Sequence, residues 1–324
     1  MSLFAAIDVG SNTLRLLIAG MEGKRIIDIF SDRKITRLGA GVDRTGMLRE
    51  ENMETSLMAL REFASVISQY GVKHVKAFAT SALRESSNSG IFIEKVLKDT
   101  GIPVEVISGE KEAELTLKGA LFSFPDSAFS PAADESYSAL IVDIGGGSTE
   151  WILYKDNRTV DMGSMPVGVM KLAGNCIKND PVSDDDISAL HREISIHVNS
   201  LIRRIGKYSD RHTQFIGTAG TFSTIASIDL ALETYSREKI HLHTLSLAGL
   251  REMNKKLLSL TTEQRKNISG LEPERSDLII PGLNFTINIM ERFEFPELIV
   301  SEYGILEGAI LNLEDSGEKN ISET

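Results

Sequence analysis

An aspartate followed by a glycine-containing turn occurs twice in the sequence, each time between two apolar runs. The first copy spans residues 8–13 and begins at Asp8, and the second spans residues 143–149 and begins at Asp143. Each copy predicts two strands joined by a tight polar turn. The two aspartates lie 135 positions apart, which is too long a period for a solenoid and is typical of two duplicated domains.

Around these turns, strands and helices are predicted to alternate along the chain. Apolar residues recur at three- and four-residue spacing from 49 to 70, which predicts an amphipathic helix. This alternation indicates an α/β fold. The other predicted strands are residues 26–29, 35–38, 72–79, 104–107, 213–216 and 298–301, and the other predicted helices are residues 91–98, 110–121, 184–205 and 222–232.

The chain has 324 residues, more than a single hydrophobic core usually accommodates. Residues 124–136 lack periodicity and contain two prolines, so they are predicted to form the linker between two domains. We expect an N-terminal domain over residues 1–125 and a C-terminal domain over residues 136–302.

The glycines of the turns suggest contact with an anion, because glycine lets the backbone approach a ligand and consecutive N–H groups can form an anion-binding nest. Alone, the first copy is better explained as an ordinary hairpin turn. The second copy has three consecutive glycines, which would weaken a strand unless they served a purpose such as cradling phosphate. The predicted phosphate-binding residues in these two turns are Gly10, Ser11, Asn12, Thr13, Gly145, Gly146, Gly147 and Ser148.

A third glycine turn, residues 217–221, lies between a predicted strand and a predicted helix. Free N–H groups at a helix N-terminus bind anions, although an ordinary helix cap would have the same sequence. The residues expected to contact phosphate here are Gly217, Thr218, Gly220 and Thr221. Asp143 and Glu150 flank the second turn, and their carboxylates suit Mg²⁺ that is held by few protein ligands and by phosphate oxygens.

Six segments match, in order, the pattern of the exopolyphosphatase and guanosine pentaphosphate phosphohydrolase family: residues 6–13, 79–84, 107–113, 142–150, 281–282 and 300–304. The three turns also resemble those of the actin, Hsp70 and sugar kinase superfamily. The resemblance implies two ribonuclease-H-like domains with an interdomain cleft that clamps phosphates. It further implies that a C-terminal helix over residues 303–315 packs back on the N-terminal domain.

The same resemblance implies catalytic roles for Glu112, Asp143, Glu150 and Arg84. Glu112 would be the base that orients or deprotonates the attacking water, and Arg84 would contact substrate phosphate. A divalent cation, Mg²⁺ or another, would be held by Asp143, Glu150 and Asp8. Lys34 and Arg37 are further possible phosphate contacts, while Arg275 and Asp277 either are structural or line the nucleotide side of the cleft.

The composition restricts partners and compartment. The net charge of −11 opposes nonspecific binding to nucleic acid or anionic lipid. A single cysteine, Cys176, fits a reducing cytoplasm, and neither a signal peptide nor a membrane-spanning stretch is predicted. We therefore expect a cytoplasmic protein that binds neither nucleic acid nor membrane, and the resemblance implies a homodimer.

Two substrates stay open within the family: the end of an inorganic polyphosphate chain, or the 5′ γ-phosphate of guanosine pentaphosphate. A protein that binds polyphosphate or guanosine penta- or tetraphosphate without turnover is the alternative from another class. An ATP-dependent kinase fits less well, because the contexts of Glu112 and of residues 302–304 match the hydrolases. Longer relatives carry an extra helical C-terminal portion, and its absence here leads us to expect short chains and low processivity.

Overall fold

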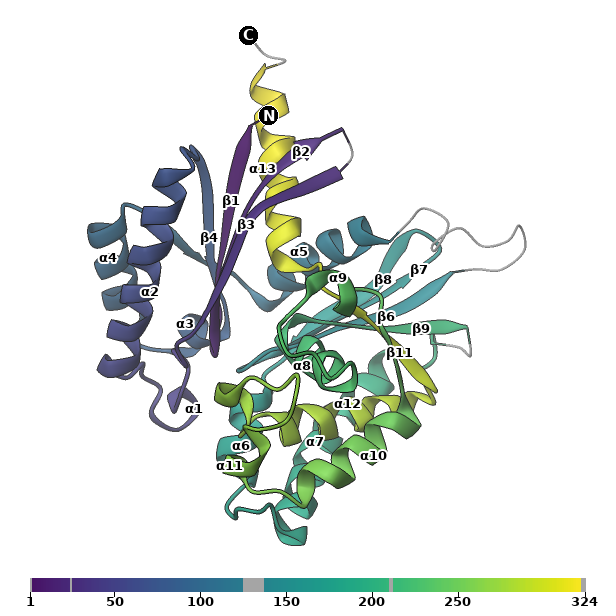
Figure 1. The fold of residues 1–324 in the computed structure, drawn as a ribbon. Helices are drawn as coiled ribbons and strands as arrows, with labels where there is room; N and C mark the ends of the chain where they lie inside the picture. The colour runs from purple at the N-terminus through teal and green to yellow at the C-terminus, as the bar shows by residue number, and fades with distance from the viewer. Residues whose placement is uncertain (1, 24, 125–136, 210–211, 322–324) are drawn as a thin grey trace. The chain divides into compact units, whose positions relative to one another are not determined.

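The computed structural model describes residues 2–23, 25–124, 137–209 and 212–321, and its chain forms two compact units. Unit 1 contains Met1–Phe122 and Gly304–Thr324, and unit 2 contains Ser123–Tyr303. Most of the predicted linker, residues 125–136, lies outside the described residues. Each unit has its own sheet and its own hydrophobic core (Figure 1).

Unit 1 is built on a five-stranded sheet in the order β3-β2-β1-β4-β5. β1, β2 and β3 are antiparallel, whereas β4 and β5 run parallel to β1. The strands are β1 Leu3–Val9, β2 Thr13–Glu22, β3 Arg25–Ile35, β4 His74–Ala79 and β5 Val104–Val106. The helices are α1 Val42–Thr45, α2 Glu50–Gln69, α3 Ser81–Glu85, α4 Ser89–Thr100, α5 Gly109–Ser123 and α13 Ile305–Ile321.

Side chains of β1 alternate between two cores, as expected for a strand covered on both faces. Ala5, Ile7 and Val9 face a core that includes α2 and α4. Phe4 and Ala6 face a second core that includes α5 and α13. Figure 1 shows these helix pairs on opposite faces of the sheet of unit 1.

Unit 2 repeats this plan with a six-stranded sheet in the order β10-β11-β9-β6-β7-β8. β6, β7 and β8 are antiparallel and β9 is parallel to β6, as β4 is to β1. The strands are β6 Ser138–Ile144, β7 Thr149–Lys155, β8 Arg158–Met165, β9 Thr213–Thr218, β10 Thr244–Ser246 and β11 Glu297–Ser301. The helical segments are α6 Val169–Cys176, α7 Asp184–Ile205, α8 Ala219–Asp229, α9 Arg237–Ile240, α10 Leu247–Leu258, α11 Thr262–Arg265, η1 Pro273–Arg275 and α12 Ile279–Phe293.

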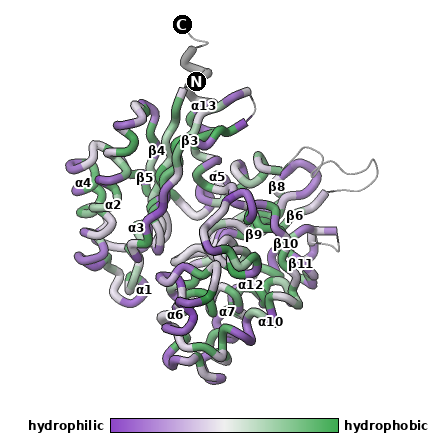
Figure 2. Tube along the Cα trace, in the orientation of Figure 1, coloured by the Kyte–Doolittle hydropathy of each residue, from purple (hydrophilic) through white to green (hydrophobic). Residues whose placement is uncertain are grey.

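The core of unit 2 gathers around α12, whose sequence is apolar on most sides. Eleven of its residues are buried, from Ile279 to Met290. Figure 2 shows hydrophobic stretches along α12 and along β4 of unit 1. In the described part of the chain, no helix is both long enough and apolar enough to cross a membrane.

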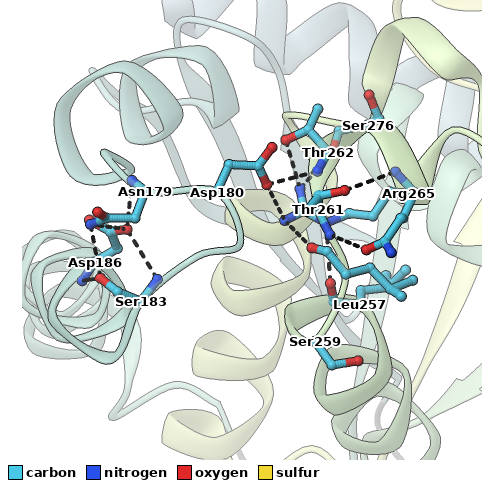
Figure 3. A network of polar contacts seen from close by, with 12 residues as sticks. Asn179, Asp180, Ser183, Asp186, Leu257, Ser259, Thr261, Thr262, Arg265 and Ser276 are labelled. Atoms are coloured by element: carbon cyan, nitrogen blue, oxygen red, sulfur yellow. Dashed lines mark hydrogen bonds and ion pairs between the residues drawn. The ribbon is translucent and has the colours of Figure 1, made fainter.

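The N-terminus of α7 carries a capping box formed by Ser183 and Asp186. The Ser183 hydroxyl accepts a hydrogen bond from the Asp186 N–H, and the Asp186 carboxylate accepts one from the Ser183 N–H. Asp186 also accepts hydrogen bonds from the N–H groups of Lys178 and Asn179 and from the Asn179 amide (Figure 3). Burial raises the pKa of Asp186, but these hydrogen bonds outweigh burial and hold the pKa below its usual 3.8.

We predict that Asp186→Asn lowers the free energy of unfolding by about 1–3 kcal/mol at neutral pH, because it removes a charged acceptor from several donors. Since the folded-state pKa is lowered, the contribution exists above the unfolded pKa and disappears as pH falls through the folded pKa. Urea unfolding at several pH values measures both effects. Asp185→Asn, at an exposed neighbour in the same turn, is the control, and an equal loss in the control would contradict the prediction.

Candidate functional site

The two aspartate-glycine turns have the same backbone geometry. In unit 1, the Gly10 N–H donates to the Thr13 carbonyl at 3.2 Å. In unit 2, the Gly145 N–H donates to the Ser148 carbonyl at 3.0 Å. The duplication predicted from the sequence is therefore present at the level of single hydrogen bonds.

The residue that faces the aspartate differs between the two copies. Asp8 lies opposite Arg15 on β2, and the Arg15 guanidinium donates to Asp8 Oδ2 at 2.7 and 3.0 Å. At the equivalent place in unit 2, Asp143 lies opposite Glu150 on β7. The same backbone thus carries an ion pair in unit 1 and two carboxylates in unit 2.

The Asp143 and Glu150 carboxylates are deeply buried, since these residues are 6% and 1% exposed. Directly opposed residues of antiparallel strands have Cβ atoms about 4.5–5.5 Å apart, and like charges at this distance are destabilising. Glu150 Oε1 accepts a hydrogen bond of 2.7 Å from the Ser164 hydroxyl on β8. The two carboxylates therefore extend from the same face of the sheet, next to the glycine turn.

The turn of unit 1 is anchored through its carbonyl groups. The Asn12 carbonyl accepts from the N–H groups of Thr36 and Arg37 at 3.0 Å each, and the Ser11 carbonyl accepts from the Gly39 N–H at 2.8 Å. The side-chain oxygen of Asn12 is buried and has no hydrogen-bond partner among the residues described. An oxygen acceptor does not bind phosphate, so the anion contacts predicted for this turn would have to come from N–H and hydroxyl donors.

The glycines of the second turn fit against the start of α6. Gly145 and Gly146 accept hydrogen bonds through their carbonyls from the N–H groups of Val169 and Met170, at 3.0 and 2.9 Å. A methyl group on Gly168 would lie 2.5 Å from the carbonyl of Gly146. Close backbone packing therefore accounts for glycine at these places and leaves the outward N–H groups as the expected anion contacts.

The third turn joins β9 to α8, which begins at Ala219, three residues earlier than predicted, with Thr218 as its N-cap residue. The Thr221 hydroxyl donates to the Ile144 carbonyl at 2.7 Å and so connects α8 to the end of β6. A methyl group on Gly220 would lie 2.7 Å from the Arg275 guanidinium, so this buried arginine packs on the first turn of α8.

Arg265, which the sequence analysis did not single out, fixes the segment that carries Arg275. Its guanidinium is 1% exposed and donates to the carbonyls of Leu257, Leu260 and Ser276 at 2.9 to 3.2 Å (Figure 3). Burial lowers the pKa of Arg265, and nearby Asp180 opposes this effect. A buried arginine with three carbonyl acceptors is a structural residue, and only its contacts reveal this role.

Glu112 and Arg84 come together in unit 1. Glu112 lies in the first turn of α5, where its side chain is 11% exposed, and Arg84 lies at the end of α3. Arg84 Nη1 donates to Glu112 Oε2 at 3.2 Å and to the Ile107 carbonyl at 2.9 Å. The arginine expected to contact phosphate is therefore bonded to the expected base.

The predicted site residues are divided between the units. Asp8, residues 10–13, Arg84 and Glu112 belong to unit 1, whereas Asp143, Glu150 and the other two glycine turns belong to unit 2. Lys34, a possible phosphate contact, forms ion pairs with Glu62 at 2.9 Å and with Asp32 at 3.5 Å.

The sequence analysis did not identify Arg15, Ser164 or Gly168 as residues of the site. For Arg15 a signal existed, because it occupies in the first copy the place that Glu150 has in the second. In the described ranges, no group of three or more His, Cys, Asp or Glu side chains forms a metal cluster.

The close packing of Gly168 against the second turn yields a testable prediction. Gly168→Ala should destabilise the protein by about 1–3 kcal/mol, because the new methyl group must displace the backbone of Gly146. Thermal unfolding measures the loss. Gly174→Ala in α6 is the matched control, since a methyl group there meets nothing within 4 Å, and equal melting temperatures for the two variants would refute the packing argument.

Known proteins resemble this chain over nearly its whole length. Exopolyphosphatase 2 of Mycobacterium tuberculosis is 31% identical over 322 residues, which cover 95% of this chain and 98% of that protein. The bifunctional 3-dehydroquinate synthase/phosphatase of Fusobacterium nucleatum is 34% identical over 318 residues, 95% of this chain. The match covers only 46% of that longer protein, so the chain spans about half its length.

A solved structure of an exopolyphosphatase from Cytophaga hutchinsonii has a TM-score of 0.87 and 30% identity, covering 97% of this chain and 98% of that one. This likeness confirms the predicted α/β fold class with two duplicated domains. The sequence profile of the Ppx/GppA phosphatase family matches residues 17–317. This chain therefore belongs to the Ppx/GppA phosphatase family.

Proposed function

We propose that this protein hydrolyses the terminal phosphoanhydride bond of inorganic polyphosphate and releases orthophosphate. The observation that carries the proposal is the buried pair Asp143 and Glu150, opposed across two strands beside a glycine turn. Two adjacent carboxylates offer the hard oxygen ligands that a divalent cation prefers. A cation and backbone N–H donors are what phosphoryl transfer needs, since its main demands are positioning and charge neutralisation.

The donor set fits Mg²⁺. Asp143 and Glu150 offer hard oxygen ligands, and the described residues bring no third acidic or imidazole group into a cluster with them. Mg²⁺ is typically held by one or two carboxylates and completes its shell with water and phosphate oxygens. Asp8, also expected to bind metal, accepts two hydrogen bonds from Arg15, so the proposal assigns the metal to Asp143 and Glu150.

When bound, Mg²⁺ would neutralise charge on the phosphate oxygens. The N–H groups of residues 146–148 and the N-terminus of α8 would bind the remaining phosphate oxygens. The buried guanidinium of Arg275 packs on the first turn of α8, and it forms an ion pair with Glu272 at 2.7 Å. These local donors would offset the repulsion between a polyanion and a chain of net charge −11.

Glu112 is the proposed general base. Its carboxylate would accept a proton as the oxygen of water attacks the terminal phosphorus, and the bond from that phosphorus to the bridging oxygen would break. The released chain would keep the bridging oxygen as its new terminal phosphate oxygen. Arg84 would orient Glu112 through Oε2 and so direct the carboxylate toward the water.

The relatives support polyphosphate as the substrate. Exopolyphosphatase 2 matches this chain over nearly the full length of both proteins, and the structure from Cytophaga hutchinsonii is also named an exopolyphosphatase. Guanosine pentaphosphate, the second substrate expected from the sequence, is tested in the same assay.

The assay for the proposal measures phosphate release with short polyphosphate, long polyphosphate and guanosine pentaphosphate, each with Mg²⁺. We expect a higher kcat/KM with polyphosphate than with guanosine pentaphosphate. A higher kcat/KM with guanosine pentaphosphate would replace the proposed substrate. If wild-type protein binds these anions but releases phosphate from none of them, the chain is a binding protein and the proposal is wrong.

We predict that Glu112→Gln lowers kcat by about 10²–10⁴-fold, because a carboxamide cannot accept the proton of the attacking water. The substitution preserves the shape of the side chain, so the melting temperature should change little. Glu110→Gln, at an exposed glutamate in the same helical turn, controls for loss of charge near the helix N-terminus. Wild-type kcat in Glu112→Gln would remove Glu112 from the mechanism.

Metal binding gives an independent prediction. At a concentration 100 times its dissociation constant, Mg²⁺ should increase the free energy of unfolding of the wild-type protein by about 2.7 kcal/mol. The melting temperature should rise accordingly. The variants Asp143→Asn and Glu150→Gln should lose this increase, while Glu105→Gln, at an exposed residue of β5, should keep it. An unchanged increase in both site variants would place the metal elsewhere.

A further inference from the structure

Two helices of unit 1, α5 and α13, touch through their backbones. A methyl group on Gly119 of α5 would lie 1.9 Å from the Gly304 carbonyl oxygen and 3.0 Å from the Gly308 nitrogen. A methyl group on Gly308 of α13 would lie 2.0 Å from the Leu115 carbonyl oxygen. Both approaches are far shorter than a real Cβ contact, so the helices are this close only because both residues are glycine.

The contact lies on the face of α5 that carries Glu112. Seven residues separate Glu112 from Gly119, which is about two helical turns and about 10 Å along the axis at 1.5 Å per residue. Leu115, three residues after Glu112, lies between them on the same face. The expected base and the contact with α13 therefore lie about two turns apart on the same face of α5.

The start of α13 is itself fixed. Glu307 is buried, and its Oε2 accepts a hydrogen bond of 2.7 Å from the Gly304 N–H. Ile305, Ala309 and Ile310 are packed in the core beside the β1 residue Phe4. α13 is thus packed against the sheet, and α5 packs directly on α13.

A second contact lies farther along the same helix pair. Lys118 Nζ donates to Asn312 Oδ1 at 2.7 Å. This hydrogen bond restrains rotation of α5 about its own axis relative to α13. The position and the rotation of the helix that carries Glu112 are accordingly both set by α13.

We propose that Gly119 and Gly308 are positioning residues for Glu112. The inference rests on the proposed function, because it assumes that Glu112 acts as the base. The hydrogen bond from Arg84 orients the carboxylate, whereas the glycine contact fixes the helix from which the side chain extends. A side chain at either glycine pushes α5 away from α13, and the tilt displaces the first turn of α5 with Glu112.

The test compares Gly119→Ala and Gly308→Ala with Gly90→Ala. Gly90 lies in α4 of the same unit, and a methyl group there meets nothing within 4 Å. We expect kcat of the two contact variants to fall by about 10²-fold at unchanged KM, since a displacement of 1 Å at a reacting group can cost that much. Gly90→Ala should keep the wild-type kcat and KM.

Rates are measured below the melting temperature of each variant, and the folded fraction is determined by circular dichroism. A merely structural role would lower the melting temperature and leave kcat per folded molecule at the wild-type value, and that result would overturn the proposal. An equal loss in Gly90→Ala would also overturn it.

If neither contact variant folds, Asn312→Ala decides the matter, because it removes the hydrogen bond from Lys118 without adding a clash. A lower kcat at unchanged KM then supports the proposal, and wild-type kcat refutes it. The proposed function fails separately, by absence of phosphate release in the wild-type protein.

Discussion

The antiparallel register of β6 and β7 is the constraint on which the proposed chemistry depends. It places Asp143 directly opposite Glu150, and the hydrogen bond from Gly145 to Ser148 closes the turn that fixes this register. A slip by one residue would move Glu150 to the other face of the sheet. The resulting pair of adjacent carboxylates supplies the oxygen ligands to which the proposed function assigns the metal.

In unit 1, the equivalent strands and turn carry an aspartate and an arginine in place of the two carboxylates. Its turn has the equivalent hydrogen bond from Gly10 to Thr13, but Asp8 meets Arg15 and its charge is balanced within the protein. The strand, turn and strand are therefore the same in both copies, whereas the residue opposite the aspartate is an arginine in one copy and a glutamate in the other. The expected base, Glu112, belongs to the unit whose own aspartate is already paired.

Much of the fold was predictable because its signals are local. The periodic apolar residues of α2 and the capping box of α7 identify those helices without reference to the rest of the chain. The start of α8 was predicted three residues too late, because Ala219 and Gly220 are typical of a loop in sequence. In the structure, Ala219 has a φ of 69° and the first turn of α8 packs against Arg275 and the Ile144 carbonyl. The third strand region predicted from residues 26–29 and 35–38 is the single strand β3, because its pairing with β2 over the whole of Arg25–Ile35 comes from the sheet.

The sequence by itself determined the duplicated turns, the strand and helix alternation, the family resemblance and the presence of acids beside glycines. These features depend on local periodicity, turn chemistry and motif order. Only the tertiary structure decided that Asp8 is paired with Arg15, that Arg84 is bonded to Glu112, and that Gly119 and Gly308 bring two helices into backbone contact. The reason is physical: each of these is a contact between elements that the sheet and the cores bring together, and its energy depends on distances that no local pattern encodes.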